Sequence, residues 1–227
     1  GGAKCICPGL VGTETIAAHH KKVMETKTKV GPMLDENPFR NDLEEVVERA
    51  KLNMILNCIL NLETKICHIV AGEPHAAYRK GVELARPVCE VRVPAKADVI
   101  ISAAHPLGID FRQSAKAAFN TQDALRDNGV LIVVSPCKEG VGNIRASDNP
   151  PTVKKIRKLF KLGLKGLVWK SILKSGYGVE DAAGVFQMFK FIARKNYVMC
   201  SSTLNEQDKK VAWMCSHAGT IEEAIAT

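Results

Sequence analysis

Two apolar segments of strand length, 97–102 and 129–135, constrain the fold most, because an amphipathic helical segment lies between them. Strands that are apolar on both faces are typical of a parallel sheet covered by helices. Two such strands joined by a helix form a βαβ unit. The sequence therefore predicts an α/β fold, with the connecting helix running from Asp110 to Leu125.

The segments on either side extend this pattern. Apolar runs at 54–60 and 65–70 predict a hairpin. Asn37 is expected to cap a helix that has Pro38 at its first position. Further elements are expected as helices at 74–85 and 179–195 and a strand at 196–201. We expect two lobes with a cleft between them, the second lobe being an open, mostly parallel sheet with flanking helices.

Composition limits the class of protein. Apolar residues make up 46% of the 227 residues, which is typical of a globular chain, and no apolar run is long enough to span a bilayer. The net charge of +8 could suit nucleic acid, but only 5% of residues are aromatic. The basic stretch 154–161 has the pattern of a solvated amphipathic helix face. We expect no nucleic-acid partner and no membrane partner.

The eight cysteines show no regular spacing. Cys58, Cys67 and Cys200 lie in strand-like runs, so we expect buried, reduced thiols in a cytoplasmic protein. The alternative is a zinc site that includes Cys5 and Cys7.

The first twenty residues hold a candidate cofactor site. A glycine pair leads to Lys4, a Pro-Gly turn follows, and a capped helix carries His19 and His20. A desolvated lysine amine is a nucleophile and a neutral imidazole is a metal ligand. Positions 4 and 20 lie close enough to share one cofactor. Because neighbouring helical residues differ by about 100° in direction, at most one of the two histidines is expected to face it.

Two loops follow the carboxyl ends of predicted strands, where open α/β sheets bind ligands: 103–108 and the glycine-containing 135–143. On the helix after the first loop, Gln113 and Lys116 are i, i+3 neighbours and offer an amide and a cation to a carboxylate. The alternative is two solvated helix residues. His105 is either a specificity residue or an ordinary loop histidine.

Several of these motifs resemble the nickel-pincer lactate racemase family, over nearly the whole chain. The most specific are the interval from Lys4 to His20 and the Gln113/Lys116 pair. The others are Gly1-Gly2-Ala3-Lys4, Pro8-Gly9, Thr15-Ile16, 31–37 with the following helix, Asn57, Ala71-Gly72-Glu73 with Ala77, Arg79 and Gly81, Pro106-Leu107, Glu139-Gly140 with Gly142, and 220–224.

The resemblance implies an isomerase that racemises lactate or a related 2-hydroxy acid by proton-coupled hydride transfer. Its cofactor is nickel held by a pyridinium thioamide/thiocarboxylate mononucleotide. Lys4 would attach to this cofactor, His20 would ligate nickel, and Lys116 with Gln113 would hold the substrate carboxylate. The resemblance also assigns 1–92 to the C-terminal part of the cofactor-bearing domain, 93–208 to a second α/β domain, and 209–227 to the start of a return to the first.

The sequence departs from this family near the first loop and near 181–184. Gly108, Asp110 and Arg112 replace Asp, Asn and Tyr, and the aromatic residue expected near 181–184 has no counterpart. The identity of the 2-hydroxy acid therefore stays open, as does the oligomeric state.

The family's proton-transferring histidines precede the glycine pair. We therefore expect this piece to be inactive by itself. We also expect it to be cut at both ends, because it opens on a glycine pair instead of Met and stops just after Thr220 caps the start of a helix. The alternatives are a non-catalytic relative that binds a nucleotide-like or small acidic ligand, and a basic nucleic-acid binder.

Overall fold

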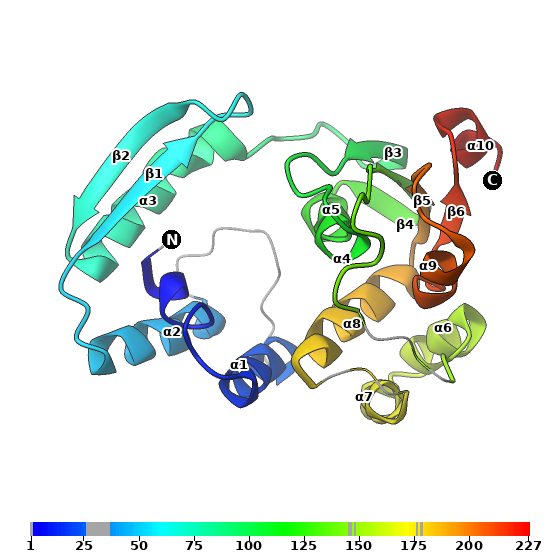
Figure 1. The fold of residues 1–227 in the computed structure, drawn as a ribbon, viewed down its shortest axis with the longest axis horizontal. Helices are drawn as coiled ribbons and strands as arrows, with labels where there is room; N and C mark the ends of the chain where they lie inside the picture. Colours follow the sequence, from blue (N-terminus) through cyan, green and yellow to red (C-terminus); the bar gives the residue numbers. More distant parts are fainter. Residues whose placement is uncertain (1, 26–36, 145–146, 148, 176, 178) are drawn as a thin grey trace. The chain divides into compact units, whose positions relative to one another are not determined.

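The computed structural model describes residues 2–25, 37–144, 147, 149–175, 177 and 179–227. The chain divides into two compact units, Gly1–Val93 and Pro94–Thr227. Both units combine helices with a sheet (Figure 1). The predicted α/β class is confirmed, and the predicted cleft between the lobes stays a prediction.

The first unit is built around a hairpin backed by one helix. Strands β1 and β2 pair antiparallel, and α3 packs against both. Ile55, Ile59 and Val70 are buried between the hairpin and the helix. The elements are η1 (Gly2–Cys5), α1 (Thr13–Glu25), α2 (Pro38–Arg49), β1 (Ile55–Leu60), β2 (Ile66–Gly72) and α3 (Pro74–Cys89).

The opposite face of this hairpin is exposed. Leu56 is 62% exposed and Ile69 is 59% exposed. Cys58 and Cys67 are exposed as well, so the prediction that these two thiols are buried is wrong. A two-stranded sheet has two faces, and α3 covers one of them. Alternating apolar residues identify a strand, but they do not show which face is covered.

The second unit contains four parallel strands in the order β3-β4-β5-β6. Parallel pairing needs crossover connections, and α4 with α5 supplies the one between β3 and β4. The elements are β3 (Ala97–Ala103), α4 (Phe111–Ser114), α5 (Lys116–Thr121), β4 (Leu125–Val134), α6 (Val153–Lys161), α7 (Lys165–Lys174), α8 (Val179–Ile192), β5 (Asn196–Cys200), α9 (Glu206–Val211), β6 (Ser216–Ala218) and α10 (Ile221–Ala226).

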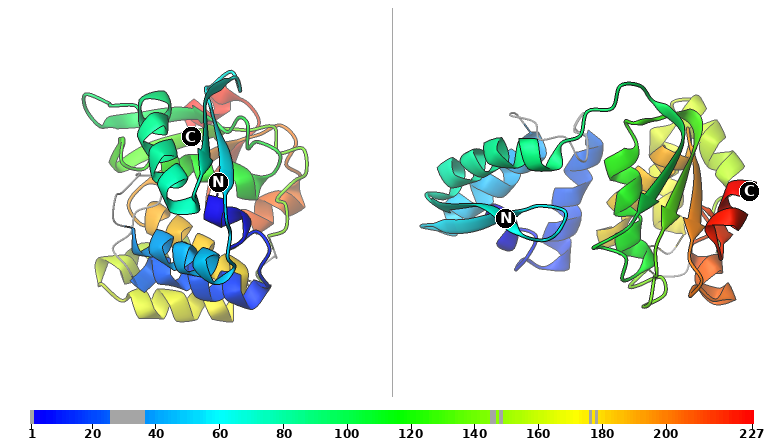
Figure 2. Two further views of the ribbon diagram at one scale, coloured as in Figure 1. Left: turned by 90° about the vertical axis from the view of Figure 1, so that its left-hand side faces the viewer. Right: turned by 90° about the horizontal axis from the view of Figure 1, so that it is seen from above.

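Helices cover both faces of this sheet (Figure 2). Ile132 and Val198 pack with Ala224 of α10. On the other face, the ring centroid of Tyr197 lies 6.3 Å from that of Phe111 of α4 and 6.2 Å from that of Phe191 of α8. Successive residues of a strand point to opposite faces, so an apolar strand such as β4 can be buried on both.

One helix differs from expectation. The helix predicted from Asp110 to Leu125 is divided at Ala115 and ends at Thr121, because Leu125 begins β4 and pairs with Ala97 of β3. Residues 209–227 contribute β6 and α10 to the second unit, and the expectation that they start a return to the first domain stays a prediction.

His217 of β6 should make the second unit acid-sensitive. Burial lowers the pKa of its imidazole, although a hydrogen bond between its Nε2 and the Ala212 carbonyl opposes this. The unfolded chain binds this proton near pH 6.5 and the folded chain resists it, so stability is lost as the pH falls below that value.

We expect His217→Gln to lose less unfolding free energy than the wild type between pH 7.5 and about pH 5.5. Urea titrations should be followed by fluorescence, because the chain's two tryptophans, Trp169 and Trp213, both lie in the second unit. His68→Gln, on exposed β2, is the control. Equal pH dependence in wild type and His217→Gln would contradict the prediction.

Candidate functional site

Lys4 lies on a turn whose neighbours are anchored in the first unit. Ala3 and Cys7 are buried with Leu43 and Val47 of α2, whereas Lys4 is exposed. The Cys7 amide donates to the Ala3 carbonyl at 3.0 Å. The turn is therefore anchored by the buried Ala3 and Cys7, and Lys4 stays exposed.

Gly9 is required to close this turn. Its amide donates to the Lys4 carbonyl at 3.2 Å. A Cβ atom at Gly9 would lie 2.2 Å from the Cys5 carbonyl oxygen, which no side chain can tolerate. The glycine of the Pro-Gly motif thus fixes the backbone that carries Lys4.

The two adjacent histidines of α1 have different environments. His19 is 3% exposed, its Nδ1 lies 2.7 Å from the Asp42 carboxylate, and its ring centroid lies 3.8 Å from that of Phe39. His20 is partly exposed, with its ring centroid 6.1 Å from that of Phe39. His19 therefore belongs to the packing between α1 and α2, and His20 is the more accessible imidazole.

These residues fit a cofactor that brings its own metal ligands. Among the described residues, no group of three or more His, Cys, Asp or Glu side chains could hold a metal ion. One imidazole is an incomplete coordination sphere for nickel, so the remaining donor atoms would have to come from a bound group. Lys4 and His20 both lie in the first unit, with accessible side chains. Their assignment stays a prediction.

In the second unit, Asp110 fixes the start of the helix that carries Gln113. Its carboxylate caps α4 by accepting the Gln113 amide at 2.6 Å. Gly142 of the loop after β4 packs directly on this carboxylate, and a Cβ there would lie 2.7 Å from it. Gly142 has a φ of 71°, which also favours glycine. The glycine loop and the helix cap therefore hold each other in place.

The two loops at the carboxyl ends of β3 and β4 run side by side. The Cys137 amide donates to Gly108 at 3.1 Å, Glu139 donates to Ile109 at 2.9 Å, and Phe111 donates to Gly140 at 2.9 Å. These bonds join 104–111 to 135–142, so the predicted ligand-binding loops form one paired structure. His105 is exposed on the first loop, and the structure does not decide whether it is a specificity residue or an ordinary loop histidine.

The structure brings Gln113 and Lys116 together. The Lys116 ammonium donates to the Gln113 Oε1 at 2.5 Å. Lys116 is exposed and Gln113 is half-buried. An ammonium group carries three N–H donors and the Gln113 amide carries an NH2 group, and donors of both types suit a carboxylate.

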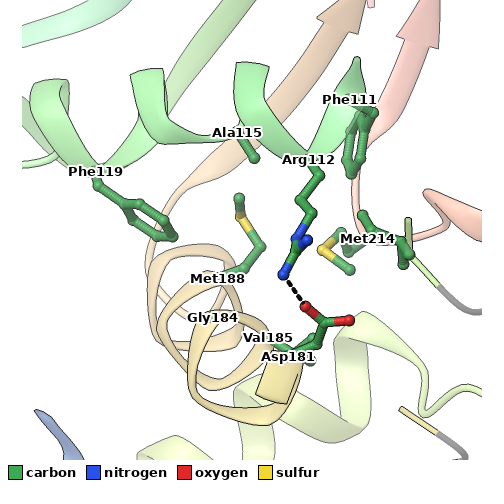
Figure 3. A pocket seen from close by; sticks show the side chains of 10 residues that line it. Phe111, Arg112, Ala115, Phe119, Asp181, Gly184, Val185, Met188 and Met214 are labelled. Atoms are coloured by element: carbon green, nitrogen blue, oxygen red, sulfur yellow. Dashed lines mark hydrogen bonds and ion pairs between the residues drawn. The ribbon is translucent and has the colours of Figure 1, made fainter. Parts of the chain in front are cut away.

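An apolar pocket that the sequence did not predict borders this helix. It has a volume of about 90 Å3, and Arg112 of α4 forms an ion pair with Asp181 of α8 across it (Figure 3). In the sequence, Arg112 is marked only as a departure from the family. Its pairing with a residue 69 positions away has no local signal.

The fold and the site together define an α/β protein with an amide–ammonium pair at the carboxyl ends of parallel strands. No protein-family model matches the chain. It is 30% identical over 146 residues to a lactate racemase of Thermoanaerobacterium thermosaccharolyticum, and 28% identical over 147 residues to that of Lactiplantibacillus plantarum. Each match covers 63% of this chain and 34% of the relative.

A solved structure of the lactate racemase apoprotein from Thermoanaerobacterium thermosaccharolyticum has the same fold. It superimposes with a TM-score of 0.76 at 22% identity, covering 100% of this chain and 53% of that one. These matches confirm the resemblance, and the chain is related to the lactate racemase family. It spans about a third of the length of the curated relatives. Within the resemblance, Gly1 and 31–36 lie outside the described residues.

Proposed function

We propose that this chain is part of a racemase or epimerase that acts on lactate or a related 2-hydroxy acid. The observation that carries the proposal is the Gln113–Lys116 contact, placed beside the paired loops of the second unit. The curated relatives named lactate racemase support the reaction class.

Lys116 and Gln113 would bind the substrate carboxylate. Lys116 supplies a charge-assisted hydrogen bond and Gln113 donates from its amide nitrogen. Because Asp110 caps α4 and Gly142 packs on Asp110, the pair is held in place before substrate binds. Such pre-organisation lowers the ordering cost of binding.

Lys4 and His20 would hold the cofactor, a nickel ion in a pyridinium thioamide/thiocarboxylate mononucleotide. Lys4 would form the covalent attachment and His20 would supply the one protein ligand to nickel. When bound, this cofactor supplies the acceptor for the hydride of the substrate α-carbon. The residues of this chain would attach the cofactor and orient the substrate acid.

The cellular setting follows from the thiols. All eight cysteines are free, and we place the protein in the cytoplasm, where thiols stay reduced. In the part of the chain that the structure describes, no helix is both long enough and apolar enough to cross a membrane.

A second candidate is a non-catalytic relative that binds a nucleotide-like or small acidic ligand. It is favoured by the roles of the residues proposed here, which bind and orient a ligand, and none of which is assigned as a proton-transferring base. Racemisation by the full-length protein decides between the two, measured as loss of optical purity of D- and L-2-hydroxy acids. We expect the 227-residue chain by itself to show none.

Lys116→Ala should weaken lactate binding by about 10- to 100-fold, since a hydrogen bond to a charged group contributes about 1.5–3 kcal/mol. Isothermal titration of the 227-residue chain with L-lactate measures the effect. Lys154→Ala removes an equally exposed lysine from α6 and should leave the affinity unchanged. Equal affinities of Lys116→Ala and wild type would exclude Lys116 as the carboxylate site.

A further inference from the structure

The apolar pocket of the second unit lies against the same helical segment as the carboxylate pair. Arg112, Ala115 and Phe119 line one side of the pocket, and Val185 and Met188 of α8 line the other (Figure 3). Lys116 does not itself line the pocket, but it directly follows the lining residue Ala115 in the chain. A ligand whose carboxylate is bound at Lys116 can therefore extend a short tail into the pocket.

Gly184 keeps the pocket open. It lies within α8 and lines the pocket, and a Cβ added there would meet no atom within 4 Å. A glycine in a helix interior is destabilising relative to alanine, and neither backbone conformation nor crowding requires one at this position. The absence of a side chain at 184 leaves space for a ligand.

The ion pair makes the pocket electrically neutral. The Arg112 guanidinium is bonded to the Asp181 carboxylate, whose side chain is only 11% exposed. A second carboxylate on the ligand would have to compete with Asp181 for Arg112. The rest of the lining is aromatic, aliphatic and thioether, which favours an uncharged, apolar tail.

We propose that this pocket binds the substrate side chain, and that the substrate is a 2-hydroxy acid with an aliphatic side chain of three to four carbons. The inference rests on the proposed function, because it takes the Gln113/Lys116 pair as the carboxylate site. A cavity of about 90 Å3 holds about four carbon atoms, since a 150 Å3 cavity holds benzene. The methyl group of lactate would leave most of it empty.

The test is a titration of the 227-residue chain with 2-hydroxy acids of increasing length: lactate, 2-hydroxybutanoate, 2-hydroxypentanoate, 2-hydroxy-4-methylpentanoate and malate. Affinity should rise about fourfold for each added carbon, up to the branched acid. Malate should bind no more tightly than lactate. Affinity that is independent of chain length, or tightest binding of malate, overturns the proposal.

Gly184→Leu fills the pocket from α8 and should abolish this rise in affinity with chain length. Leucine is a better helix former than glycine, so the variant should fold. Gly166→Leu is the matched control, because Gly166 is also helical, also has nothing within 4 Å and does not line the pocket. It should keep the full rise, and a lost rise in Gly166→Leu would overturn the assignment to this pocket.

A probe without a carboxylate separates this inference from the proposed function. 3-Methyl-1-butanol should shift the methyl resonances of Met188 and Met214, which line the pocket, in the wild type and not in Gly184→Leu. Such shifts together with an unchanged lactate affinity in Lys116→Ala would support the pocket and overturn the carboxylate site. Absence of these shifts overturns the pocket whatever Lys116 does.

Discussion

In the full-length, cofactor-loaded protein, His20→Ala should abolish nickel retention, whereas His19→Ala should retain the metal. The two rings are neighbours on α1, but His19 is 3% exposed and bonded to Asp42, while His20 is accessible. A buried imidazole that is already hydrogen-bonded is poorly placed to ligate the metal of a bound cofactor. Metal content after gel filtration, measured by mass spectrometry, tests the assignment.

The same two variants should differ in the opposite direction in stability: His19→Ala should lose more unfolding free energy than His20→Ala. His19→Ala removes a buried ring from the Phe39 contact and a hydrogen bond to Asp42, and should cost about 2–3 kcal/mol. His20→Ala should cost less than about 1 kcal/mol. Metal loss in His19→Ala with retention in His20→Ala would refute the assignment.

Gly142→Ala should lower the unfolding free energy of the second unit by about 2–4 kcal/mol. Part of this is the left-handed backbone conformation, and part is the collision of the new Cβ with Asp110 at 2.7 Å. Because Asp110 caps α4, the variant should also weaken lactate binding at Gln113 and Lys116.

Gly163→Ala isolates the first contribution, since Gly163 also has a φ of 71° but meets nothing within 4 Å. It should cost about 1–2 kcal/mol and leave lactate affinity unchanged. Urea unfolding of Gly142→Ala and Gly163→Ala, followed by tryptophan fluorescence, gives the free energy of unfolding that each variant loses. Equal losses in the two variants would show that the Asp110 contact contributes nothing.

Short-range chemistry made parts of the fold predictable. Asn37 accepts the Phe39 amide and Thr220 accepts the Glu223 amide, as their sequence contexts indicate. The apolar runs of β3 and β4 also predicted parallel pairing, which the structure confirms. Each of these signals lies within a few residues, where side-chain caps and strand periodicity act.

Features that depend on distant partners were not predictable. Leu125 leaves the helical pattern because it pairs with Ala97, and the Arg112–Asp181 ion pair joins two helices that are remote in sequence. The contact between Gln113 and Lys116 could be predicted because an i, i+3 spacing is local. The pocket beside it could not, because half of its lining comes from α8 and Met214.

The exposure of the cysteines gives the two units different reactivity. Cys5, Cys58, Cys67 and Cys89 are exposed and all belong to the first unit. In the second unit, Cys137 and Cys200 are buried, and burial raises the pKa of the Cys215 thiol well above its ordinary value. Thiolates are the reactive form, so alkylating labels and oxidants would modify the first unit while sparing the carboxylate pair. A dye or spin label can thus be attached beside the proposed cofactor site without an engineered cysteine.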